Sequence, residues 1–374
     1  MGILTPHCNG FFVPRVEDCL PKRYNHASLS CHHILCKYYS FRLGTEMELI
    51  AKARETVLYM EKDLATSGDI LFTDHEGMKT LSPNGVVRNV TVNISDFHYE
   101  GRDWSSETYI TAFHQLSHDI IAIAGVADSI GCIHMYNRTS NAVDDVIGHC
   151  DVSGYEDGYD AYFEEFYQIS TETRDSKYLL VTDQDSYTLR AIDLHRDYYT
   201  YTVHDFYPAK KCPFFTQLDN TLYLNCYRDS DRETFIERVS FLPIDSILDD
   251  RQVEINRNQV DVSTLIQNRD VGYKDGPFST VQFNTPQAII HLGENRLLLA
   301  DEHNNVLREI NLKTETVSSV CNSRNRNIPG DMTSCSLQGP TALLIADDSL
   351  IIGSFGSISR ISLINDTSSI LTGL

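Results

Sequence analysis

One stretch, residues 271–312, constrains the fold of this chain more than any other. Three short apolar runs, 288–290, 297–300 and 306–312, are separated by polar turns at 293–295 and 301–305, and residues 316–320 supply a fourth run. Short apolar runs bounded by Gly, Asn and Asp predict β-hairpins. One meander of this length cannot bury both of its faces, so the sequence predicts an array of such units.

Weaker copies of this pattern recur along the chain. The second apolar run of each copy ends at Asp74, Asp128, Asp183, Cys226, Asp301 and Ser354. These positions are 54, 55, 43, 75 and 53 residues apart, and all but the spacing of 75 suit one four-stranded unit with its loops. The long spacing contains residues 243–270, which we interpret as a polar insertion. Six four-stranded units predict a closed β-propeller.

The motif residues of this stretch resemble the NHL repeat, the unit of one class of β-propeller. The residues that carry the resemblance are Asp275-Gly276, Phe283, Pro286, Asp301, Asn304-Asn305 and Arg308. A second match contains Asp157-Gly158, Phe163, Asp183 and Arg190. The resemblance implies an all-β chain: a six-bladed β-propeller of NHL type over residues 43–374, behind a short Cys-rich N-terminal segment, residues 1–42.

The segment 1–42 holds four of the ten cysteines, Cys8, Cys19, Cys31 and Cys36. It is too short for a core of its own, so it needs disulfides, a metal or a partner surface. Cys31, His32 or His33, and Cys36 suggest a zinc site, but Cys8 and Cys19 are not the second close pair typical of structural zinc, which favours disulfides. We expect this segment to dock on a neighbouring subunit. The first residues lack the apolar core of a signal peptide, so either the protein is not secreted or this is a mature chain.

The remaining cysteines fall in neighbouring pairs, Cys132/Cys150, Cys212/Cys226 and Cys321/Cys335, separated by 18, 14 and 14 residues. We expect disulfides that recur at the same place between blades, and therefore an oxidising compartment. The alternative is free cysteines in a cytosolic NHL scaffold. Four sequons begin at Asn89, Asn93, Asn137 and Asn365. We expect glycans at these positions, because Asn89 and Asn93 share the polar face of an expected edge strand at 86–95.

Charge and hydropathy exclude two classes of partner. The net charge of −21 comes from 31 basic and 52 acidic residues, which argues against nucleic acid. No 18-residue apolar window predicts a membrane-spanning helix. Residues 46–54 contain good helix formers and predict one or two helical turns, ahead of a first strand at 56–62.

The sequence offers few candidates for catalysis. We expect Asp74, Asp183 and Asp301 to accept backbone N–H groups in the turns that follow them. His114 and His118 would approach each other only on a helix, and on a strand they lie about 13 Å apart. His75 and His303 fall in expected turns. The recurring motifs of hydrolases, zinc peptidases and nucleotide-binding proteins are missing. The alternative is a metal-dependent propeller enzyme resembling the peptidyl-hydroxyglycine amidating lyases.

Residues 155–167 are dense in carboxylates and aromatic rings. One interpretation is a Ca²⁺ or basic-partner surface; the favoured one is a loop with Phe163 in the core and its charges in water. We therefore expect no cofactor, with Ca²⁺ as the one candidate. The preferred function is an extracellular, disulfide-bonded, N-glycosylated propeller that acts as a protein-interaction or structural subunit. We expect it to bind other protein subunits, as a homo-oligomer or in a filament or sheet, and not to be an enzyme.

Overall fold

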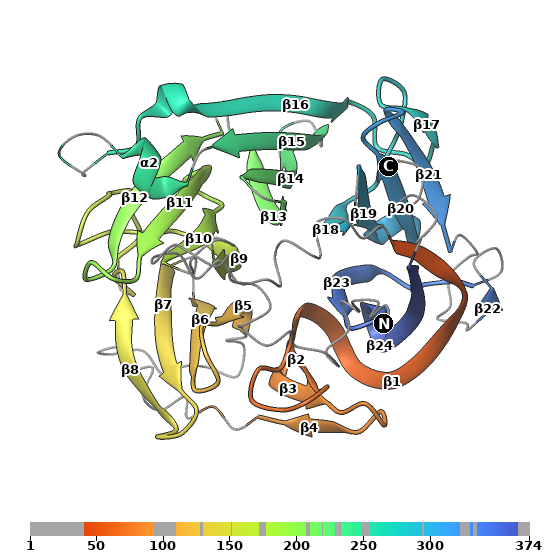
Figure 1. The fold of residues 1–374 in the computed structure, drawn as a ribbon, viewed down its shortest axis with the longest axis horizontal. Coiled ribbons are helices and arrows are strands. Elements are labelled where there is room, and N and C mark those ends of the chain that lie inside the picture. The colour runs from red at the N-terminus through yellow and green to blue at the C-terminus, as the bar shows by residue number, and fades with distance from the viewer. Residues whose placement is uncertain are drawn as a thin grey trace, which may run out of the picture.

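The computed structural model describes residues 41–90, 92, 110–127, 130–150, 152–171, 177–206, 210–218, 220–228, 230, 233–241, 243–248, 251, 254–293, 295–321, 330–331 and 335–365. These residues form six antiparallel blades arranged in a ring (Figure 1). The predicted six-bladed β-propeller is therefore confirmed. Residues 1–40 lie outside the described part, so the expected Cys-rich segment and its boundary at residue 42 stay predictions.

Blades 1 to 3 follow one another along the chain. Blade 1 contains the end of β1 (Phe41–Lys62), then β2 (Ile70–Asp74), β3 (Gly77–Leu81) and β4 (Val87–Asn89). Blade 2 contains β5 (Ile110–Gln115), β6 (Ile120–Ala127), β7 (Ile130–Asn137) and β8 (Ala142–Ile147). Blade 3 contains β9 (Phe166–Thr171), β10 (Tyr178–Asp183), β11 (Thr188–Asp193) and β12 (Tyr199–Asp205).

Blades 4 to 6 complete the ring. Blade 4 contains β13 (Lys211–Leu218), β14 (Thr221–Arg228), β15 (Glu233–Phe241) and β16 (Val260–Asn268). Blade 5 contains β18 (Pro286–Gly293), β19 (Arg296–Asp301), β20 (Val306–Asn311) and β21 (Thr316–Val320), and β17 (Gly276–Pro277) pairs with β21. Blade 6 contains β23 (Pro340–Ala346), β24 (Ser349–Asn365) and the start of β1, with which β22 (Gly330–Asp331) also pairs.

Strand β24 is a folded hairpin. Gly356 has a φ of 76°, which glycine adopts without steric cost. Leu363 donates its N–H to the Asp348 carbonyl at 2.5 Å, as Leu312 does to Asn295 at 2.7 Å in blade 5. The two halves of β24 are therefore the second and third strands of blade 6.

Strand β1 closes the ring. Its first part pairs with residues 355–365 of β24, and its last part pairs with β2 of blade 1. Figure 1 shows this long strand curving around β24. A closed ring was expected from six four-stranded units, and the strands that close it are β1 and β24. The expected helix at 46–54 was wrong: these residues belong to β1, because pairing with β24 outweighs their weak helix propensity.

The interpretation of residues 243–270 as an insertion was wrong for residues 260–268, which form a strand of blade 4. This segment contains α2 (Ile244–Ile247), η3 (Arg257–Gln259) and the whole outer strand of blade 4, β16. Residues of β16 alternate irregularly between exposed and half-buried positions, because one edge of an outer strand faces water. The apolar signal of such a strand is therefore weak.

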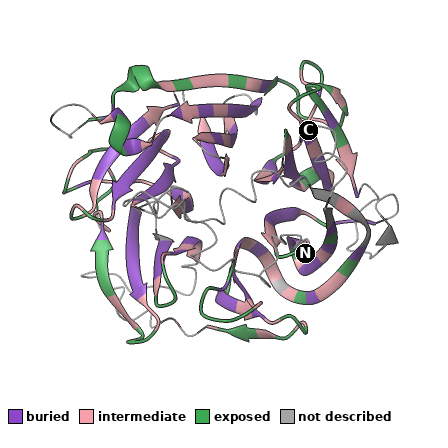
Figure 2. Cartoon of the chain, in the orientation of Figure 1, coloured by how far each residue is buried: buried purple, intermediate pink, exposed green. Residues whose placement is uncertain are grey.

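Apolar side chains fill the spaces between neighbouring blades. Every residue of β10 and β11 is buried, whereas outer strand β8 is mostly exposed or half-buried. Figure 2 shows the contrast within blade 2, where β7 is mostly purple and the outer strand β8 mostly green and pink. Among the described residues, no helix is long and apolar enough to cross a bilayer.

Candidate functional site

The innermost strands enclose a cavity of about 660 Å³ on the axis of the ring. Its walls come from β1, β9, β13, β18 and β23, the first strands of five different blades. Most of the wall is apolar, and its polar groups include Tyr59, Glu61, Gln168 and His291. Ligand pockets commonly have this makeup, an apolar wall with a few polar groups.

Three blades meet at Glu61 beside this cavity. The His114 Nδ1 lies 2.6 Å from Glu61 Oε1, and Thr171 donates its backbone N–H to His114 Nε2 at 3.2 Å. Gln115 donates its backbone N–H to Glu61 Oε2 at 3.0 Å. Because Glu61 belongs to β1, His114 to β5 and Thr171 to β9, the contacts join blades 1, 2 and 3. We call this group the axial clamp.

The axial clamp leaves its histidine little chemical freedom. Since Nε2 accepts an N–H, the proton of a neutral ring sits on Nδ1 and points at the carboxylate. Both ring nitrogens therefore have partners within the protein. Burial, followed by the charge of Glu61, raises the pKa of the neighbouring Tyr59 well above its usual value, so Tyr59 stays protonated.

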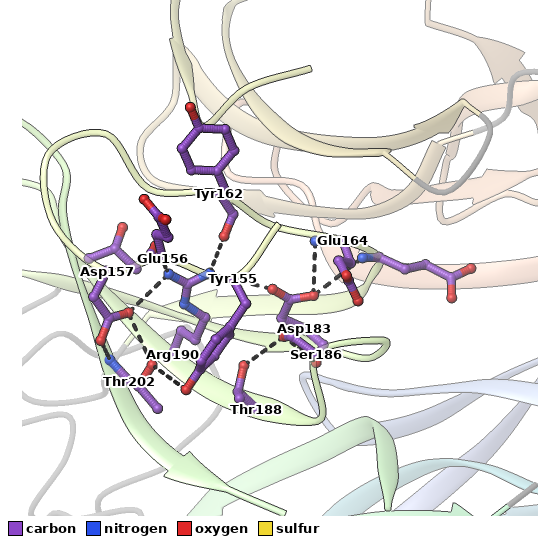
Figure 3. A network of polar contacts seen from close by, with 12 residues as sticks. Tyr155, Glu156, Asp157, Tyr162, Glu164, Asp183, Ser186, Thr188, Arg190 and Thr202 are labelled. Carbon is purple, nitrogen blue, oxygen red and sulfur yellow. Dashed lines mark hydrogen bonds and ion pairs between the residues drawn. The ribbon is translucent and has the colours of Figure 1, made fainter. Parts of the chain in front are cut away.

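The repeat motif forms a second polar constellation, shown for blade 3 in Figure 3. Arg190 in β11 is fully buried, and its Nη1 lies 3.4 Å from Asp183 Oδ2 at the end of β10. Its Nη2 lies 2.9 Å from Asp157 Oδ1 in the loop that leads into the blade. The same guanidinium also donates to the carbonyls of Tyr162 and Glu156. Thr202 in β12 donates its N–H to Asp157 Oδ2 at 2.7 Å.

Blade 5 repeats these contacts residue for residue. Arg308 lies 2.8 Å from Asp301 and 2.9 Å from Asp275, and donates to the carbonyls of Gln282 and Lys274 at 2.9 and 2.7 Å. Ser319 donates its N–H to Asp275 at 3.0 Å. Two aromatic rings lie against each guanidinium, Tyr155 and Phe163 in blade 3, Tyr273 and Phe283 in blade 5. We call each such group a blade brace.

The blade braces correct one expectation about the motif aspartates. Asp183 accepts the N–H groups of Glu164 and Glu165, and Asp301 that of Asn284, so both hold the preceding loop. Of the three, Asp74 accepts a backbone N–H from the following turn, that of Glu76 at 2.9 Å, as expected, and Asp301 accepts a side-chain N–H from Asn304 at 2.9 Å. Burial raises the pKa of Asp183 and Asp301 despite the nearby arginines.

The arginines at the centre of the blade braces were missed as site residues. The available signal was a spacing that both repeats share: each arginine lies 7 residues after the motif aspartate and 33 after the Asp-Gly aspartate. Asp128, the motif aspartate of blade 2, lies outside the described residues.

The acidic aromatic segment, residues 155–167, has the structure favoured from the sequence, in which Phe163 lies in the core. Phe163 is fully buried, and the Asp160 side chain is 88% exposed. Asp157 departs from that expectation, because it belongs to a blade brace. Tyr159 is 60% exposed and meets the ring of Tyr199 edge-on, with centroids 4.7 Å apart.

The described part of the chain contains three disulfides: Cys132–Cys150, Cys212–Cys226 and Cys321–Cys335. We had expected the disulfides to recur at the same place between blades, but each lies at a different place. Cys212–Cys226 joins the first two strands of blade 4, and Cys321–Cys335 links the end of blade 5 to the loop before blade 6. The other four cysteines, Cys8, Cys19, Cys31 and Cys36, lie outside the described residues.

The disulfide of blade 2 has a histidine beside it. His134 Nε2 lies 3.8 Å from both Cys132 Sγ and Cys150 Sγ. His134 is 3% exposed, and its burial lowers its pKa to about 4, so the ring is neutral near pH 7. Among the described residues these three side chains form the one group of three or more His, Cys, Asp or Glu with metal-binding spacing. This group was not predicted from the sequence. The spacing Cys132-x-His134 could have indicated it, because alternate residues of a strand share a face.

The remaining candidates fall in different parts of the ring. His75, His118 and His303 are exposed in turns, as expected for His75 and His303. His114 is on a strand, so His118 is not its partner. Asn89 in β4 is exposed, whereas Asn137 at the end of β7 is half-buried and donates its side-chain N–H to Asp144 at 2.8 Å. Asn93 and the side chain of Asn365 lie outside the described part.

Comparisons with known proteins support the fold alone. No protein-family model matches the chain, and no curated protein matches it either. The solved structure of an auxiliary nutrient binding protein from Bacteroides thetaiotaomicron matches with a TM-score of 0.60 and 10% identity, over 86% of this chain and 77% of that one. A putative phosphatase from the same organism matches with a TM-score of 0.59 and 10% identity, over 86% of this chain and 79% of that one. A protein of unknown function from that organism has a TM-score of 0.56 at 9% identity, over 86% and 77%.

Proposed function

We propose that this chain is an extracellular, N-glycosylated β-propeller of NHL type that acts as a protein-interaction or structural subunit and not as an enzyme. The observation that carries the proposal is the set of three disulfides, because such bonds persist in oxidising compartments. The two blade braces support the NHL assignment, since they place the motif residues of both repeats in one arrangement. The axial clamp supports a binding role, because its histidine is fully engaged within the protein.

One face of the ring suits a protein partner. Loops that lead into a blade and turns between its second and third strands lie at the same face, because successive antiparallel strands alternate in direction. The large exposed residues of this face include Tyr155, Tyr159, Val271, Tyr273 and Phe355. We call it the aromatic face. Tyrosine is enriched in protein interfaces.

Charge indicates the kind of partner for the aromatic face. Glu156 and Asp160 are exposed beside Tyr155 and Tyr159, and the chain as a whole carries a net charge of −21. A basic segment of another subunit is therefore the complementary partner.

Peptide mapping tests the proposed compartment. The full chain is produced through the secretory pathway of a eukaryotic culture and mapped by mass spectrometry without reduction. We expect all three disulfides and a glycan at Asn89, with less at Asn137, whose amide already binds Asp144. Thiols at these six cysteines in the secreted protein, with unmodified Asn89, would contradict the proposal and favour a cytosolic scaffold.

Sedimentation velocity tests the subunit role. We expect the average mass to rise with concentration, and the double variant Tyr159→Ala, Tyr273→Ala to lower it. Val86→Ala is the matched control, because Val86 is 41% exposed in a turn between third and fourth strands, at the opposite face. A monomer at every concentration contradicts assembly of like subunits.

A further inference from the structure

We propose that Cys132, His134 and Cys150 form a redox-gated metal site: a disulfide when oxidised and, after reduction, a three-ligand site for a thiolate-binding cation such as Zn²⁺. This inference goes beyond the proposed function and does not depend on it. It starts from the position of the imidazole, whose Nε2 lies 3.8 Å from each of the two sulfur atoms.

Two of the three distances between the proposed ligand atoms match those of a metal site. A tetrahedral zinc with Zn–S near 2.3 Å and Zn–N near 2.0 Å places sulfur and nitrogen about 3.6 Å apart, and its two sulfurs about 3.8 Å apart. Both sulfur–nitrogen distances are already within a few tenths of an ångström of that value. The sulfur–sulfur distance must grow, and the imidazole must turn, because Cys132 Sγ also lies 4.0 Å from Nδ1 and is therefore beside the ring. Two thiol sulfurs separate to about this distance once their bond is broken, because van der Waals repulsion then keeps them apart.

The local fold holds the three ligand residues close together both before and after the disulfide is reduced. Cys132 and His134 are alternate residues of β7 and share the face turned toward blade 1, whose core includes Tyr136 from the same face. Cys150 is brought over them by a turn at Gly148, which has a φ of 87° and would clash with Phe163 if it carried a Cβ. Cys150 is also the more exposed cysteine, which gives a reductant and a cation a path to the site.

The ligand types define the cation. Thiolates and imidazole together favour zinc or copper(I) over calcium or magnesium, which take oxygen ligands. Three protein ligands leave the fourth position of a tetrahedral cation to water.

The redox step balances with a dithiol as reductant. The dithiol supplies two electrons and two protons, the Cys132–Cys150 bond breaks to give two thiols, and the dithiol leaves as its own disulfide. The cation then displaces the two thiol protons.

Cobalt(II), a coloured substitute for zinc, tests the site. The full chain carries Cys31→Ser and Cys36→Ser, which remove a competing cluster, and is reduced with a phosphine that does not itself supply thiols. We expect about one Co²⁺ per chain, with a thiolate-to-cobalt charge-transfer band that Zn²⁺ abolishes. The same chain without reduction should give no such band.

Three variants in this background separate the proposed site from nonspecific binding. Cys132→Ser with Cys150→Ser should abolish the band, and His134→Gln should weaken cobalt affinity about tenfold or more. Cys212→Ser with Cys226→Ser is the matched control and should keep the band, because it removes a buried disulfide that has no such histidine in the described structure. Melting temperatures of the oxidised proteins show whether His134→Gln folds.

Two results overturn the inference. One is a reduced chain that takes up no cobalt, whether or not it stays folded. The other is a folded His134→Gln variant that binds cobalt as tightly as its parent.

Discussion

Arg308 carries a full charge at a position that water does not reach. Its side chain is 0% exposed, and so is that of Asp301, its partner. A buried pair of this kind adds little net stability over an apolar pair, but removing one member leaves the other charged and unsolvated. The two blade braces therefore make their blades intolerant of a change at arginine.

Replacing Arg308 with methionine should lower the free energy of unfolding by about 3–5 kcal/mol, because Asp301 loses its counter-ion and two carbonyls lose their donor. Urea denaturation measures this loss. Arg360→Met is the matched control: the Arg360–Glu48 pair is exposed, with side chains 38% and 63% accessible, and its loss should cost at most about 1 kcal/mol. Equal costs for the two variants would show that the blade brace is not a buried ion pair.

At the scale of single residues, the sequence identifies important residues more reliably than it identifies their roles. The role of Asp301 as a structural brace was predictable, because a short carboxylate after a strand is a common backbone acceptor. The role of Arg308 was not, since a charged residue in an alternating strand is normally solvated. The approach of Cys150 to His134 requires the turn at Gly148, which spacing alone does not specify.

Neighbouring elements are joined by polar contacts as well as by apolar ones. The axial clamp links three inner strands through His114, and its removal leaves the Thr171 N–H and the Glu61 carboxylate each short of a partner. His114→Ala should therefore cost about 2–3 kcal/mol of stability. His118→Ala, in the exposed turn that follows, should stay within about 0.5 kcal/mol of the parent. The denaturant midpoints of the two variants measure this difference. Similar midpoints would mean that the axial clamp does not contribute to stability.

Blades 1 and 2 are also joined by an ion pair that depends on pH. Asp63 is buried, which favours its neutral form, but hydrogen bonds from Arg138 at 2.6 and 3.0 Å and from Ala65 outweigh burial and lower its pKa. A lowered folded-state pKa gives stability that is complete above the unfolded pKa, about 4, and is lost as pH falls through the folded value.

Asp63→Asn should therefore lower stability by about 2–3 kcal/mol at pH 7 and progressively less below pH 4. Thermal unfolding between pH 7 and pH 3 measures the difference between variant and parent. The exposed Lys62–Asp347 pair supplies the control, because Asp347→Asn should cost at most about 1 kcal/mol at pH 7. A constant gap between Asp63→Asn and its parent at every pH would contradict the assignment.

Strand prediction succeeded where strands are buried on both faces and was uneven at the rim, where β21 was predicted and β16 was not. The apolar runs of β10 and β19 were visible because both of their faces contact neighbouring blades. The outer strand β16 was hidden in a polar segment. β1 was assigned partly to helix, because its pairing partner in β24 lies some three hundred residues away and local sequence carries no trace of it.

At the scale of the whole molecule, the ring depends on β1. Deleting residues 1–56 removes the outer strand of blade 6 and should abolish cooperative unfolding, since the edge of β24 is then unpaired and open to aggregation. Deleting residues 1–40 keeps β1 and should leave one cooperative transition. Calorimetry and limited proteolysis compare the two. A folded 57–374 chain would show that closure is dispensable, and an unfolded 41–374 chain would contradict the predicted division near residue 42.

The closure by β1 also sets the order in which the chain can fold. Glu48 and Arg360, which face each other across the closing strands, are 312 residues apart. At about 5–20 residues per second, the ribosome delivers the second partner roughly 15–60 s after the first. During that interval blades 1 to 5 can form in sequence, while the first part of β1 has no partner and exposes an edge. Joining the two ends is therefore a late step with very high contact order. A nascent chain stalled before blade 6 should be the form that chaperones bind longest.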